Sequence, residues 1–289
     1  MFGRYRRARY VQTLDPARDY AEICRILTRY EFPWDYRVGF QFSVMTDLLI
    51  PSISRVLAES RNFADEGQKR FDDTMLAEYE VKRHGPDSGH GRETVRVVNN
   101  IHRRYAITNE DFLYVLVSQT LSPIDWINSY AWRRLTDHEI QALVLSARRQ
   151  GELMGITGIP EDYAGFRRLL AENRTGRAVF APVNREVAEH VLAVIVGWFP
   201  AVLRPLVGML VPLAIAAFLD PPLPDVLGLR TPPRWFTRLV RGSMRARGLL
   251  FRVLPPRRES RPYLPRPRSY RQGWTVHDLG PSRHQSPHG

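Results

Sequence analysis

Helix-start signals recur along this chain, and the apolar residues between them repeat at helical spacing. Asp15 precedes a proline, Thr108 precedes two acidic positions, and Thr136–Glu139 has the pattern of a capping box. Asn184 begins a further apolar stretch in the same way. Neither period-two alternation nor a tandem repeat competes with this pattern. The sequence therefore predicts an all-α fold: a single multi-helix globular domain.

The expected helices follow from these signals and from the intervening breaks. We expect helices over residues 15–30, 36–60 with a kink at Pro51, 64–84, 92–105, 111–121 and 136–154, and others after 160 and 184. The domain boundaries are then a basic N-terminal segment over residues 1–14, a helical body over 15–229 and an Arg/Pro-rich tail over 230–289.

The positive charge is confined to the tail. The formal net charge is +12, and residues 230–289 alone carry 14 Arg against two acids, so residues 1–229 are neutral. A body without net charge does not attract a polyanion, so we do not expect nucleic acid as a partner of the body.

The single cysteine, Cys24, excludes an internal disulfide and suits a reducing compartment. No secretory signal is found, so we expect a cytoplasmic protein that can be peripheral to a membrane.

The tail divides into two parts. Residues 234–253 alternate Arg with apolar side chains, which predicts a basic amphipathic helix suited to an anionic membrane surface. Arg with interleaved aromatic residues also suits nucleic acid, and a merely solvated extension is an equally common role. From Leu254 onward the composition is rich in Pro and Arg, and we expect disorder.

Two apolar stretches precede the tail, over residues 191–203 and 205–219. Each is shorter than the roughly 18 apolar residues that a membrane span requires. We favour two buried core helices. The alternative is an apolar wall that receives a lipid-like substrate or dips into a membrane surface.

Signatures of several large enzyme classes are absent from the sequence, including Gly-x-Ser-x-Gly, a phosphate-binding loop with Lys, and His-Glu-x-x-His. His84 and His90 flank a Gly- and Pro-containing segment that could bind a metal, but we favour a solvent-exposed turn there.

Two other patterns favour a cofactor site. Arg70 and Thr74 are four positions apart, so on a helix they share a face and can hold a carboxylate or a bound oxygen species. His102 lies on an apolar helix face, where a neutral imidazole is suited to ligate iron. A hydrogen-bonded core histidine is the commoner role for such a residue, and the pattern alone leaves both open.

An ordered set of segments resembles the MpaB-type oxygenase family, whose catalytic domain is shared with rubber oxygenase (latex-clearing protein). The resemblance covers about Asp15 to Gly228. The segments that carry it are Leu14-Asp15-Pro16, Phe32-Pro33-Trp34-Asp35, Lys69-Arg70-Phe71-Asp72-Asp73-Thr74, Asn99-Asn100-Ile101-His102-Arg103-Arg104-Tyr105, Phe112-Leu113-Tyr114-Val115-Leu116, Tyr130-Ala131-Trp132-Arg133 and Met154-Gly155-Ile156-Thr157-Gly158-Ile159-Pro160.

The resemblance implies a helical fold around haem b and oxidative cleavage of carbon–carbon double bonds in an apolar isoprenoid or lipid-like substrate, with dioxygen as co-substrate. His102 matches the proximal iron ligand, while Arg70 and Thr74 match residues of the haem pocket and would carry its catalytic roles. Asp73 stands where rubber oxygenase has a lysine that can cap the iron, so a resting state closed by lysine is not expected. No residue matches the family's distal glutamate. The rival interpretation is a non-enzymatic membrane or interaction protein docked through residues 234–253.

Overall fold

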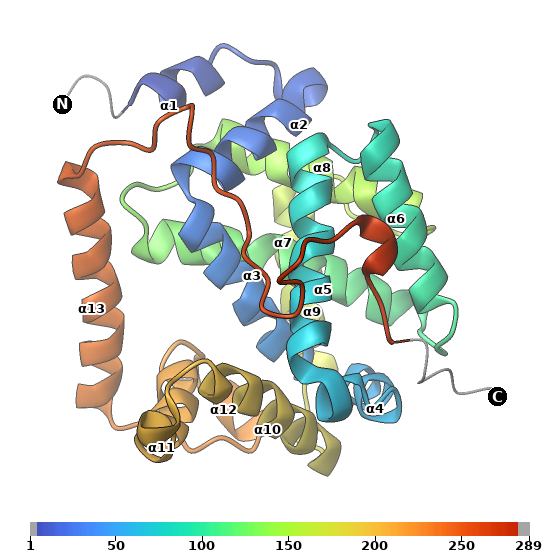
Figure 1. Cartoon of the computed structure of the whole chain (residues 1–289), viewed down its shortest axis with the longest axis vertical. Helices are drawn as coiled ribbons and strands as arrows, with labels where there is room; N and C mark the ends of the chain where they lie inside the picture. The colour runs from blue at the N-terminus through green and yellow to red at the C-terminus, as the bar shows by residue number, and fades with distance from the viewer. Residues whose placement is uncertain (1–4, 283–289) are drawn as a thin grey trace.

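The computed structural model describes residues 5–282, and within that range it is helical, without a strand (Figure 1). The prediction of an all-α fold is confirmed. The α-helices are α1 Arg6–Val11, α2 Pro16–Ile26, α3 Pro33–Asp47, α4 Pro51–Glu59, α5 Asn62–His84, α6 Gly89–His102, α7 Asn109–Tyr130, α8 Asp137–Leu153, α9 Tyr163–Gly176, α10 Pro182–Gly197, α11 Arg204–Ala216, α12 Leu223–Val226 and α13 Arg234–Val253. A π-helical turn, Leu27–Glu31, continues α2, and short 3₁₀ turns cover Ala201–Leu203 and Val276–Asp278.

The predicted helix N-termini are capped by the side chains that the sequence indicates. The Asp15 carboxylate accepts from the Ala17 backbone N–H at 2.9 Å. The Thr136 hydroxyl accepts from the Glu139 N–H at 3.3 Å, and the Glu139 carboxylate accepts from the Thr136 N–H at 2.9 Å, which completes the capping box. Pro51, however, begins α4 instead of kinking one long helix, because its ring fits the first helical turn.

The body is centred on α3 and α7, which pack along each other. Gly39 permits this close approach, since a Cβ there would lie 2.5 Å from the Pro123 Cα atom. Tyr114, which is fully buried, donates its hydroxyl to the Thr46 carbonyl at 2.9 Å and ties the same two helices. A cavity lies beside this pair, between α3, α4, α5, α6 and α7.

The apolar segment around α11 is not a core element, contrary to the favoured prediction. Only Ala216 is buried in α11, whereas Val202 is 83% and Met209 is 68% exposed. The proline-interrupted stretch packs against α10 along one side and leaves its other side open. The apolar composition predicted that these segments are helical, but it did not predict which of their faces are buried against the rest of the domain.

Residues 254–282, for which the sequence predicts disorder, follow a defined path over the body in the structure. This segment, red in Figure 1, leaves α13, crosses the body and runs beside α5. The Tyr263 N–H donates to the Arg29 carbonyl at 2.9 Å, and the Ser269 N–H donates to the Asp72 carboxylate at 2.8 Å. The backbone finds its hydrogen-bond partners on distant helices, which the segment's own composition does not reveal. The remainder of the predicted tail, residues 283–289, lies outside the described residues.

Candidate functional site

A cavity of about 220 Å³ lies between α3, α4, α5, α6 and α7. One water molecule needs only about 10–15 Å³ measured in the same way, so the space suits a much larger molecule. Its wall is mainly aliphatic and aromatic, and polar side chains such as Arg70, Glu78, His102 and Gln119 are set among the apolar ones. Residues 279–281 of the C-terminal segment complete the wall. A concave apolar space with a few convergent polar groups is the usual form of a ligand site.

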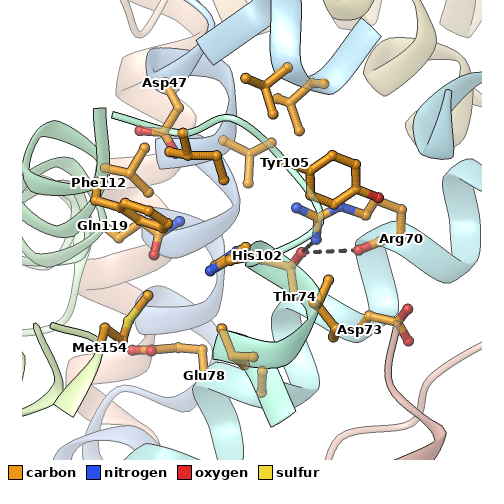
Figure 2. Close-up of a pocket in the computed structure, with 18 of the residues that line it drawn as sticks. Asp47, Arg70, Asp73, Thr74, Glu78, His102, Tyr105, Phe112, Gln119 and Met154 are labelled. Carbon is orange, nitrogen blue, oxygen red and sulfur yellow. Dashed lines mark hydrogen bonds between the residues drawn. The ribbon is translucent and has the colours of Figure 1, made fainter. Parts of the chain in front are cut away.

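His102 is the last residue of α6, and Figure 2 shows a nitrogen of its ring pointing into the cavity. The ring packs edge-on against Phe112, with 5.3 Å between the centroids. Its Nδ1 atom is buried and has no hydrogen-bond partner among residues 5–282. Burial, and then the charge of Arg70, lower the pKa of His102 to about 4. The imidazole is therefore neutral near pH 7 and offers a lone pair.

Arg70 and Thr74 project from one face of α5 beside His102 (Figure 2). An Arg70 Nη1–H donates to the Thr74 Oγ1 atom, while the Thr74 hydroxyl donates to the Arg70 carbonyl at 3.0 Å. Burial lowers the pKa of Arg70 and the negative charge of Asp73 opposes that shift in part, while no carboxylate of a described residue lies within 4.0 Å of the guanidinium. Since a cation removed from water is costly unless it is paired, this guanidinium is placed to receive an anionic group.

Asp73 also borders the cavity, but its carboxylate points away from His102 (Figure 2). Asp73 accepts from the Lys69 ammonium at 2.9 Å and from the Gly280 N–H at 3.0 Å, and the Tyr270 hydroxyl donates to it as well. Asp73 thus anchors the C-terminal segment. It stands at the position where the sequence resemblance places the iron-capping lysine of rubber oxygenase. Tyr270 shares this arrangement, and burial raises its pKa far above the ordinary value.

Asp47, at the end of α3, is a cavity residue that the sequence interpretation missed. The side chain is buried, and its Oδ1 atom has no hydrogen-bond partner among the described residues. Burial raises the pKa of Asp47 from 3.8 to about 7, and Ser118 and Gln119 oppose the shift only in part. The available signal was a lone acid inside the apolar run of residues 45–50.

Substituting Asp47 with asparagine is expected to stabilise the protein in a pH-dependent way. A carboxyl whose pKa is higher in the folded chain stabilises the fold below pH 4 and loses that contribution as the pH rises toward 7. An asparagine side chain does not ionise, so D47N should match the parent near pH 4 and exceed it by about 2–4 kcal/mol at pH 8. Urea unfolding across this range measures the difference, with Glu186→Gln at an exposed position of α10 as control. A difference that does not change with pH contradicts the assignment.

The structure brings together the three residues singled out from the sequence, because His102, Arg70 and Thr74 all line the one cavity. His84 and His90 lie elsewhere: they belong to α5 and α6 instead of a flexible loop, and they meet Glu80 there. Neither of the two borders the large cavity.

A family model described as the catalytic domain of ER-bound oxygenase mpaB/B′ and rubber oxygenase matches residues 36–248. The chain is 26% identical over 202 residues to ER-bound oxygenase mpaB′ of Penicillium brevicompactum, which covers 64% of this chain and 48% of that protein. It is 27% identical over 202 residues to ER-bound oxygenase mpaB of Penicillium roqueforti, covering 64% and 68% of the two chains.

The solved structure of latex clearing protein LCP in the closed state superposes with a TM-score of 0.59 at 16% sequence identity. The match covers 86% of this chain and 69% of that one, so the two share a fold. The chain spans about half the length of the mpaB′ protein.

Proposed function

The chain belongs to the family of the ER-bound oxygenase mpaB and rubber oxygenase catalytic domains, and on that premise we propose that it is a haem b-dependent oxygenase. Its substrate is an apolar isoprenoid or lipid-like molecule with carbon–carbon double bonds, and dioxygen is the co-substrate. The observation that carries the proposal is the unpartnered imidazole of His102 in the wall of a large apolar cavity.

The residues present fit haem b. His102 supplies a neutral nitrogen without a competing hydrogen bond at Nδ1, and Arg70 supplies a cation without an ion pair on the same side of the cavity. A haem would need one strong protein ligand for its iron, an apolar enclosure and a partner for its propionates. When bound, the haem iron supplies the activation of dioxygen, which no amino-acid side chain can perform.

The chain's own contribution is orientation, exclusion of water and proton handling. The aliphatic and aromatic wall, which includes Phe40, Val98 and Phe112, receives the hydrocarbon part of the substrate and keeps water out. Thr74 holds the Arg70 guanidinium in position. Asp47 can hold or release a proton at Oδ1 near neutral pH, because its pKa is about 7, and we propose it as the acid–base group.

The experiment is an absorption spectrum of the purified protein, before and after incubation with haem, followed by oxygen-consumption assays. We expect a Soret band and oxygen uptake with an unsaturated isoprenoid chain but not with its saturated counterpart. A protein that neither retains nor rebinds haem contradicts the proposal.

We propose in addition that the enzyme docks on an anionic membrane surface, where apolar substrates partition. The surface consists of the outward apolar side chains of α11 and α13 and the turn before α11, namely Val202, Leu206, Met209, Trp235, Leu239 and Leu249, all of which are exposed. Four exposed Arg of α13 accompany them, Arg234, Arg238, Arg245 and Arg252, and α13 contains no acid. Arg241 donates to the Ala217 carbonyl at 2.7 Å, which fixes α13 beside the end of α11.

The exposed Arg side chains would contact anionic lipid head groups, and the exposed apolar side chains would insert into the acyl region below them, as at a cytoplasmic leaflet. No helix among residues 5–282 has the length and apolarity to cross a bilayer. If the protein binds no haem, the same surface supports the alternative hypothesis of a non-enzymatic peripheral membrane protein.

Replacing Leu239 and Leu249 together with glutamate is expected to weaken binding to phosphatidylserine vesicles about tenfold or more, because it removes apolar insertion and adds repulsion. Vesicle co-sedimentation at low salt measures the effect. Val179→Glu is the matched control, since Val179 is similarly exposed but lies outside α11 and α13. Equal binding by the double variant and the parent rules out this surface.

A further inference from the structure

Three potential metal ligands converge at the junction of α5 and α6, away from the large cavity. Glu80 and His84 lie four positions apart on α5, and His90 comes from the first turn of α6. The Glu80 Oε2 atom lies 2.6 Å from His90 Nε2 and 3.2 Å from His84 Nε2. All three ligand atoms lie within 4.8 Å of one another.

The turn between the helices makes this convergence a built feature. Gly85 ends α5 at φ +81°, a conformation that side chains with a Cβ rarely adopt. Ser88 then caps α6 by accepting from the Gly91 N–H at 2.9 Å. Gly91 approaches so closely that a Cβ there would lie 2.0 Å from the Gly85 carbonyl oxygen. The start of α6 is thereby pressed against the end of α5, with His90 directed toward Glu80.

Glu80 is the inner member of the cluster, with a side chain only 4% exposed. The Arg83 guanidinium lies 3.5 Å from Oε1, which leaves Oε2 facing the two imidazoles. His84 and His90 are 33% and 40% exposed, and their ring centroids are 4.4 Å apart. The cluster thus has a buried anionic oxygen at its base and an open side toward solvent.

These separations suit a small divalent transition-metal ion. Zinc binds imidazole nitrogen and carboxylate oxygen at about 2.0–2.2 Å, so neighbouring ligands in a tetrahedral site lie about 3.3–3.6 Å apart. The pair of His84 and Glu80 is already near that separation, and the pair of His90 and Glu80 needs to open by about 1 Å or less. Side-chain rotation of the partly exposed His90 can supply that movement.

We propose that Glu80, His84 and His90 form a zinc-type metal site, with solvent in the fourth position. None of the three lines the large cavity, so the ion does not meet the substrate there. It joins the end of α5 to the start of α6, the helix whose last residue is His102. Its proposed role is to fix the helix that presents His102, with one coordination position left to solvent.

The test is Zn²⁺ binding by the full-length, chelator-treated protein, measured by equilibrium dialysis and followed by thermal unfolding. We expect one Zn²⁺ per chain. At a free concentration a hundredfold above the dissociation constant, the ratio of folded to unfolded protein rises about a hundredfold, which raises the unfolding midpoint by about 5 °C. His84→Gln and His90→Gln, made separately, are each expected to lose this stoichiometric binding.

Two controls separate this site from others. His277→Gln removes a histidine that pairs with Glu93 at 3.0 Å, and this variant should keep one Zn²⁺ per chain. His102→Ala should also keep it, so a failure of haem binding and a failure of the zinc site are distinguishable. Binding that survives in both His84→Gln and His90→Gln overturns the proposal, as does a parent protein that binds no Zn²⁺. In those cases the cluster is a histidine–carboxylate hydrogen-bonded group.

Discussion

Replacing His102 with alanine is expected to reduce the Soret absorbance per protein by about tenfold or more, because the nitrogen that would hold the iron is lost while the cavity remains. The neutral imidazole has no hydrogen-bond partner at Nδ1 among the described residues, so its removal breaks no bond at that atom. The fold should persist, and the far-ultraviolet dichroism of the variant should equal that of the parent.

A second variant makes this result specific. His102→Gly leaves space for a free imidazole, and adding imidazole should restore part of the absorbance if the ring acts as a ligand. His190→Ala, on α10 and outside the cavity, is the control and should keep its haem. An unchanged spectrum in His102→Ala would show that the iron is held elsewhere and would refute the proposed site.

Arg133→Ala is expected to destabilise the protein by about 3–5 kcal/mol, because it leaves the buried Glu139 without a cation and Glu31 with only Arg7, 3.6 Å away. Arg133 donates to both oxygens of Glu139 at 2.7 Å and to Glu31 at 3.3 Å. The side chains of Glu31 and Glu139 are 2% and 1% exposed. Burial raises the pKa of Glu31 even with Arg133 present, so the loss of that charge is costly.

Urea unfolding of Arg133→Ala, compared with Arg167→Ala, measures this effect. Arg167 pairs with Asp125 at 2.6 Å, but both side chains are nearly half exposed, and such surface pairs contribute about 1 kcal/mol or less. Similar losses in the two variants would mean that burial of the Glu31–Arg133–Glu139 group has no energetic consequence.

Local signals predicted the helical fold because each depends on a few adjacent residues. The capping box at Thr136 needs only Glu139, three positions later. The solvent exposure of each helix face was harder to predict, because it depends on which element from a distant part of the sequence packs against that face. The side of α11 left open by α10 illustrates this difference.

The candidate site divides in the same way. Arg70 and Thr74 were identifiable from their four-residue spacing, and His102 from its apolar face and the family resemblance. The role of Asp73 was not, because its partners Tyr270 and Gly280 are about two hundred positions away. The sequence favoured a loose turn between His84 and His90, and only the packing of α6 on α5 reveals their shared contact with Glu80.

The C-terminal segment has a consequence for the order in which the site is built. Phe40 and Leu279 border the same cavity, although 239 positions separate them in the sequence. A ribosome synthesises the chain from the N-terminus to the C-terminus, so the helices around the cavity are made well before residues 279–281. We therefore expect the cavity to be open on that side until residues 279–281 are made, so that a bulky ligand has access before Lys69 and Asp73 bind Tyr270 and the last part of the wall forms.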